Sequence, residues 1–102
     1  MAEKFIYPVI FEKADGGYYA HIIDFQNVTQ GDDFEDAIFM AKDCICNLIR
    51  TYRDLHLPVP EPSQQEPWTR RNKRLVMVEV DYDKWLKEAE PLKPLVFDSV
   101  DA

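Results

Sequence analysis

The chain has 102 residues, of which 46% are hydrophobic and 30% charged, the balance of one soluble globular domain. Its 19 acidic and 12 basic residues give a formal net charge of −7, which argues against a free-standing nucleic-acid binder because phosphate recognition needs a basic surface. There is no apolar run of the about 18 residues that a membrane span requires and no signal-peptide pattern at the start, so we expect a cytoplasmic protein.

The first predicted elements form a β-hairpin. Apolar residues occupy both faces of a strand at residues 4–12, and Pro8 favours an edge strand or a locally unpaired site because proline donates no ladder hydrogen bond. Residues 14–17, Ala-Asp-Gly-Gly, predict a tight turn. A second strand follows at residues 18–25, and a third, short strand is predicted at residues 28–30.

A long helix is predicted to follow the third strand. Asp32 or Asp33 is its N-cap, since an aspartate side chain accepts hydrogen bonds from the free N–H groups of a helix start. Phe39, Met40 and Cys44 make the apolar stripe wider than one sheet face needs, which indicates either a second contact or a larger core. The stripe itself keeps i, i+3, i+4 spacing over five turns at Phe34, Ala37, Ile38, Ala41, Ile45, Leu48, Ile49 and Tyr52.

The remaining elements complete one fold. Three prolines within residues 57–63 predict an extended connector, and residues 75–81 predict a last strand that is buried on both faces. The order β-β-β-α-β predicts an α+β fold, a three- or four-stranded antiparallel or mixed sheet with one long helix on one face. We assign residues 1–82 to this domain and residues 83–102 to a short C-terminal tail.

The tail raises the question of oligomeric state. Two helical turns are predicted before Pro91, and beyond them Leu95, Val96 and Phe97 form a short apolar run that needs cover. The run either packs within its own chain or docks as an exchanged strand in a homodimer or tetramer. We take these three residues as the candidate oligomer contact.

The sequence contains no recognisable catalytic or cofactor motif. Asp24, Asp36 or Asp43, and Asp81 could converge on Mg²⁺ in a nuclease, but caps, turns and solvated faces account for all four without a metal. The spacing of His21, His56, Cys44 and Cys46 matches no zinc-binding pattern. Cys44 and Cys46 are two residues apart in the predicted helix, so we expect no disulfide between them. We therefore predict no metal, no cofactor and no enzymatic activity.

Several segments in order resemble the HicB family of antitoxins. The resemblance implies a partial ribonuclease H-like domain without nuclease activity, which would bind and block HicA, a small basic toxin that cleaves mRNA. The segments that carry it are Tyr-Pro-Val-Ile-Phe-Glu-Lys at 7–13, Asp-Gly-Gly-Tyr-Tyr-Ala at 15–20, Val-Thr-Gln-Gly-Asp at 28–32, Glu-Asp-Ala-Ile-Phe-Met-Ala-Lys at 35–42 and the connector at 57–63.

The sequence departs from the family in two places. Family members often have a Pro-Asp-Leu-Pro-Gly turn before the third strand, where this chain has Ile-Asp-Phe-Gln-Asn at 23–27. The family also carries a DNA-binding helix-turn-helix or ribbon-helix-helix segment after the last strand, for which the acidic tail is too short. The four bases within residues 68–75 are interpreted as a solvated loop and strand entry, so we expect no direct DNA binding.

Charge suggests how such a toxin would be blocked. A toxin that cleaves RNA presents Lys and Arg to phosphate, and an acidic protein can occupy that surface. Two other functions stay open: an interaction or oligomerisation module with a different partner, and a metal-dependent nuclease. The candidate partner contacts are residues without a predicted core role, namely Tyr19, His21, Asp24, Asp36 and Asp43.

Overall fold

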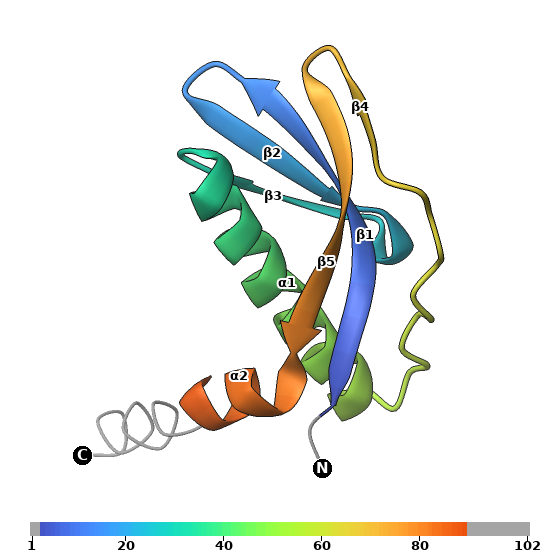
Figure 1. The fold of residues 1–102 in the computed structure, drawn as a ribbon. Helices are drawn as coiled ribbons and strands as arrows, with labels where there is room; N and C mark the ends of the chain where they lie inside the picture. The colour runs from blue at the N-terminus through green and yellow to red at the C-terminus, as the bar shows by residue number, and fades with distance from the viewer. Residues whose placement is uncertain (1–2, 90–102) are drawn as a thin grey trace, which may run out of the picture.

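A long central strand organises the sheet. The computed structural model describes residues 3–89, and in it β1 pairs with β2 on one side and β5 on the other. The strand order is β3-β2-β1-β5-β4, and every neighbouring pair is antiparallel (Figure 1). The strands are β1 (Lys4–Ala14), β2 (Gly17–Ile22), β3 (Asn27–Gly31), β4 (Trp68–Arg70) and β5 (Lys73–Asp81).

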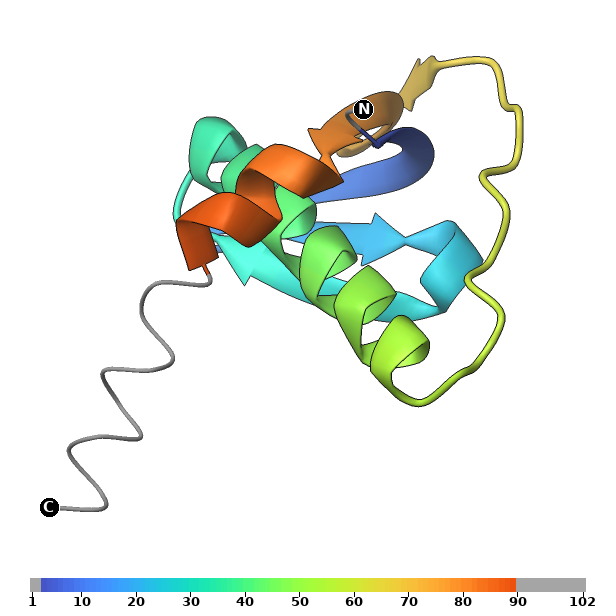
Figure 2. The same cartoon turned by 90° about the horizontal axis from the view of Figure 1, so that it is seen from below.

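Each of the two α-helices begins close to the end of the strand before it, with a very short loop or none between them. α1 (Phe34–Asp54) begins three residues after β3 and crosses the sheet, and α2 (Tyr82–Ala89) continues directly from β5. Seen from below, α2 lies on the opposite side of the molecule from the connector that links α1 to β4 (Figure 2). Within residues 3–89, neither helix is long and apolar enough to cross a membrane.

Aspartates start α1 as the sequence predicts. Asp33 is the N-cap, and its Oδ1 accepts a hydrogen bond of 2.7 Å from the backbone N–H of Asp36. In return the Asp36 Oδ2 accepts one of 2.8 Å from the N–H of Asp32. These bonds satisfy donors that a helix start leaves free, and the two carboxylates lie at the positive end of the helix dipole.

The core lies between the sheet and α1. Tyr7, Val9 and Phe11 alternate along β1 on the side that faces the helix, and each is at most 1% exposed. α1 covers them with a stripe at helical spacing, and Val78 and Val80 of β5 extend the same layer. The fully buried helix residues are Ala37, Ala41, Ile45, Cys46 and Ile49.

The α+β class and the single long helix on one face are confirmed, but the sheet has five strands where three or four were predicted. The additional strand is β4, whose three residues pair with the start of β5 at 73–75. Three residues are too few to show an alternating pattern, so the sequence predicts only a loop and a strand entry here. The strand entry is confirmed, because Lys73 and Arg74 begin β5. The bases in fact flank and form the β4–β5 turn, in which Arg71 has a positive φ of 47°.

Two further expectations for the strands need correction. β1 is the central strand, so of the two sites that Pro8 predicted, the edge position is wrong and the locally unpaired site is confirmed. The sheet tolerates this proline because the β2 ladder starts only at Val9, so Pro8 is paired with Met77 on the β5 side alone. The second strand ends at Ile22, since Ile23–Phe25 form a 3-10 turn and Gln26 has φ 49°.

Gly31 makes the close contact between β3 and α1 possible. A Cβ at this position would lie 2.6 Å from the Cα of Ala37, a backbone atom that cannot move away without displacing the helix. We expect Gly31→Ala to lower the free energy of unfolding by about 3 kcal/mol, measured by urea denaturation. Gly16→Ala is the control, because Gly16 has φ +78° with open space around it and should lose only about 1 kcal/mol. Equal losses would contradict this account.

Candidate partner-binding site

The sheet face that points away from α1, here called the open face, carries an apolar band. Because side chains alternate along a strand, residues paired across strands lie on one face in a row. A second, shorter row places Met77 beside Pro8. The first row runs across all five strands through Val28, His21, Ile10, Leu75 and Trp68.

Charged rows border the apolar band on both sides. One border includes Glu12, Tyr19 and Gln30, and continues through basic side chains of β5 and β4. The other pairs Glu79 with Ile6 and Asp81 with Lys4. An apolar centre within a polar rim is the usual anatomy of a protein–protein interface.

Three large hydrophobic side chains of the open face are exposed. Ile6 is 47% exposed, Tyr19 43% and Val28 52%, and within residues 3–89 neither helix packs over them. Tyr19 and Val28 are diagonal neighbours across the β2–β3 pair, whereas Ile6 lies six residues along β1 from Glu12, the partner of Tyr19. Single exposed apolar residues are ordinary, so the adjacent pair Tyr19 and Val28 is the part of the face that favours docking of another surface.

Tyr19 and His21 are held in place on β2. The Nε2 of His21 lies 3.0 Å from the Oε1 of Glu12 on β1, and the two rings of Tyr19 and His21 are 6.4 Å apart. These contacts limit the side-chain motion that a bound partner would otherwise have to restrict.

Each of the three predicted aspartate contacts makes bonds within the chain. Asp24 accepts hydrogen bonds of 2.8 Å from both the backbone N–H and the hydroxyl of Ser63, which fastens the connector to the 3-10 turn. Asp36 caps α1. Asp43 accepts a hydrogen bond of 2.8 Å from the Nε1 of Trp85, which joins α1 to α2. Only Tyr19 and His21 of the five predicted contacts therefore lie together.

A second bond fastens the connector. The hydroxyl of Tyr7 donates to the carbonyl oxygen of Pro60 over 2.7 Å. Burial, together with the negative charge of Asp24, raises the pKa of Tyr7 to about 12, so the phenol stays protonated and keeps donating at physiological pH.

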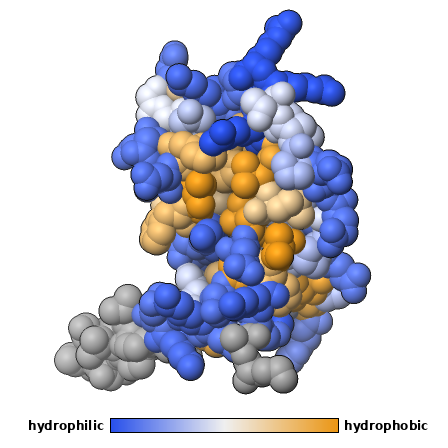
Figure 3. Space-filling model, in the orientation of Figure 1, coloured by the Kyte–Doolittle hydropathy of each residue, from blue (hydrophilic) through white to orange (hydrophobic). Residues whose placement is uncertain are grey.

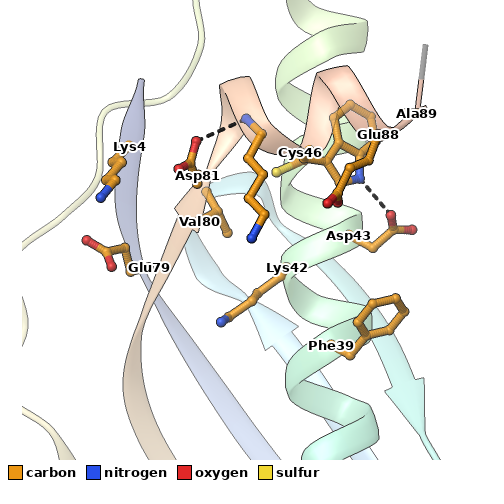
Figure 4. Close-up of a pocket in the computed structure, with 12 residues that line it drawn as sticks. Lys4, Phe39, Lys42, Asp43, Cys46, Glu79, Val80, Asp81, Glu88 and Ala89 are labelled. Atoms are coloured by element: carbon orange, nitrogen blue, oxygen red, sulfur yellow. Dashed lines mark hydrogen bonds between the residues drawn. The ribbon is translucent and has the colours of Figure 1, made fainter. Parts of the chain in front are cut away.

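A groove of about 620 Å³ between α1, α2 and β5 forms a second surface (Figure 4). Cys46 lies at its floor, and burial, reinforced by the carboxylates of Asp43 and Asp81, raises the pKa of its thiol to about 12. A neutral thiol is a poor nucleophile, so the groove is suited to docking rather than to thiol chemistry. Phe39, which widened the predicted apolar stripe, stands at its edge and is 65% exposed.

The aspartates considered for Mg²⁺ do not converge. Asp43 and Asp81 both line the groove, whereas Asp24 is bound to Ser63 beside the connector. Within residues 3–89, His, Cys, Asp and Glu form no group of three or more that could hold a metal ion.

Sequence analysis missed the apolar contribution of Ile6, Ile10 and Val28 to the open face. The signal was present, because β1 is apolar on both faces while the chain offers one long helix to cover them. The candidate oligomer contact, Leu95, Val96 and Phe97, lies outside the described residues.

Comparison with known proteins identifies the family. The family model described as the HicB-like antitoxin of bacterial toxin–antitoxin systems matches residues 5–78. The chain belongs to this antitoxin family. The match extends from β1 into β5, so it includes the open face and the whole of α1. Among curated proteins, none matches the sequence significantly.

A solved structure has the same fold. A chain of a toxin–antitoxin complex from Streptococcus pneumoniae is 22% identical, with a TM-score of 0.69 over 89% of this HicB-like chain and 78% of that one. At this identity the likeness supports the fold assignment.

The position of Asp24 yields a test of whether it is structural. Asp24→Ala removes both hydrogen bonds to Ser63, so we expect the free energy of unfolding to fall by about 2 kcal/mol in urea denaturation. Glu61→Ala is the control, because Glu61 is exposed on the same connector. Equal stability of the two variants would show that the connector is held without Asp24.

Proposed function

We propose that this HicB-like protein neutralises a small basic toxin of the HicA type by direct binding and catalyses no reaction itself. The family match over residues 5–78 carries the proposal, since it covers nearly the whole described sheet. The protein would act in the cytoplasm, where a toxin that cleaves mRNA meets its substrate.

Charge supports this partner. The antitoxin has a net charge of −7, whereas a protein that binds RNA needs a cationic surface to hold phosphate. Opposite net charges accelerate encounter, and an antitoxin that covers the cationic surface excludes RNA by occupying its place. Asp24, Asp36 and Asp43 contribute to the attraction at a distance, because their carboxylates already make bonds within the chain.

The open face is the proposed docking surface. Tyr19 supplies an exposed aromatic side chain at low entropic cost, and Val28 and Ile6 supply apolar area that water leaves when a partner docks. His21 and Glu12 bring polar groups to the same surface. Pro8 and Leu75 at the centre of the face are already buried within the chain, so the toxin would meet the exposed side chains of Tyr19, Val28 and Ile6 and the polar groups beside them.

The function is tested with the toxin encoded beside the antitoxin gene. Purified antitoxin should abolish RNA cleavage by that toxin at a one-to-one ratio of chains, and co-expression should restore growth. Continued cleavage at excess antitoxin would overturn the proposal and favour an interaction module with another partner. Cleavage of RNA by the antitoxin alone with Mg²⁺ would favour the nuclease instead.

The docking surface is tested by a matched pair of variants. Val28→Lys places a cation in the open face, so we expect at least tenfold weaker binding of the toxin in calorimetry. Leu57→Lys is the control, because it adds the same charge at a side chain that is 49% exposed but lies in the connector. This variant should bind the toxin as tightly as the wild type does.

A third variant removes the aromatic anchor of the open face. Tyr19→Ala should cost about 2 kcal/mol, or ~30-fold in affinity, with little change of thermal stability because Tyr19 is exposed. Wild-type affinity in both Tyr19→Ala and Val28→Lys would place the toxin elsewhere on the molecule.

A further inference from the structure

The outer edge of β5 is open along most of its length. β4 pairs only with residues 73–75, so within the described chain residues 76–81 have a strand partner on the β1 side alone. The backbone N–H and C=O groups that point away from β1 there form an unpaired edge, which accepts an added strand.

Apolar surface lies beside this open edge. Figure 3 shows the surface of the molecule in the orientation of Figure 1, in which β5 lies in front of α1. Apolar residues gather across the middle of this surface, and hydrophilic residues lie above and below them. Val76 is partly exposed, and Phe39 and Trp85 line the groove on the α1 and α2 sides. A strand added to β5 would therefore cover apolar side chains as well as satisfy backbone groups.

The groove also offers cations. Lys42 extends from α1 toward β5 (Figure 4). Lys84 of α2 lines the same groove, together with the carboxylates of Asp43, Glu79, Asp81 and Glu88. In the described part of the chain neither ammonium group lies in an ion pair. Because carboxylates and ammonium groups both line the groove, the occupant that fits is a short, mainly apolar strand that pairs with the backbone edge.

The chain carries such a segment directly after the groove. Ala89, the last described residue, lines the groove. After five intervening residues come Leu95, Val96 and Phe97, followed by Asp98. Val96 is β-branched and Phe97 is aromatic, and both residue types favour a strand.

We propose that residues 95–97 of one copy add to the open edge of β5 in a second copy, and that the exchange is reciprocal in a homodimer. The intervening Pro-Leu-Lys-Pro at 91–94 favours an extended polyproline conformation of about 3.1 Å per residue, which carries the chain onward rather than back along its own groove. Reciprocal exchange gives each copy one occupied groove and one bound segment, a closed twofold arrangement.

Complementation between two variants tests the exchange. Phe39→Asp damages the groove and Phe97→Asp damages the segment, so each full-length variant alone should be monomeric in analytical ultracentrifugation, where the wild type is dimeric. An equimolar mixture should regain a dimer of reduced stability, because the intact segment of the first variant fits the intact groove of the second. Leu57→Asp, at an exposed site away from the groove, should remain dimeric.

Each other outcome overturns the proposal. A monomeric wild type, or a mixture that stays monomeric, means that the segment does not exchange; a dimer in both single variants places the interface elsewhere. Phe39 is 65% exposed, so the fold should survive its substitution, and an unchanged thermal midpoint checks this. None of these measurements contains the toxin, so they succeed or fail independently of the antitoxin assay.

Discussion

The central strand β1 imposes the constraint on which the whole structure depends, because it is apolar on both faces. Tyr7, Val9 and Phe11 on one face are covered by α1 and are almost completely buried. No second long helix is available for the other face, where Ile6 and Ile10 lie in a sheet that the described helices leave open. Pro8 and Leu75 on this face are buried, but Ile6, Tyr19 and Val28 stay in contact with water, so a partner that covers these side chains gains the free energy of their burial.

The sequence predicted the elements well where a periodic pattern ran long enough to be read. The α1 stripe and the aspartate caps are local features, and they appear where the spacing places them. β4 was missed because three residues carry no period. For Pro8 the sequence left an edge position and an unpaired site open, because propensity does not tell where a neighbouring ladder ends, and the unpaired site is the one found. Strand order is a property of long-range pairing, which local patterns do not encode.

The site was harder to predict than the fold, for a physical reason. An aspartate in a sequence looks the same whether it binds a partner or a neighbouring segment of its own chain. Asp24 and Asp43 join elements that are about forty positions apart, to Ser63 and Trp85 respectively, and only the folded chain reveals this. Tyr19 and His21 could be placed together because strand alternation puts residues i and i+2 on one face.

The position of β1 also has a consequence for synthesis on the ribosome. β1 is the first strand to be made, yet one of its two neighbours, β5, ends 67 residues later, at Asp81. At about 5–20 residues per second, β1 waits roughly 3–13 s with one side unpaired. During that interval the unpaired edge of β1 is exposed to proteases and to the strands of other unfinished chains. The cellular level of the protein would therefore depend on how fast translation finishes the last strand.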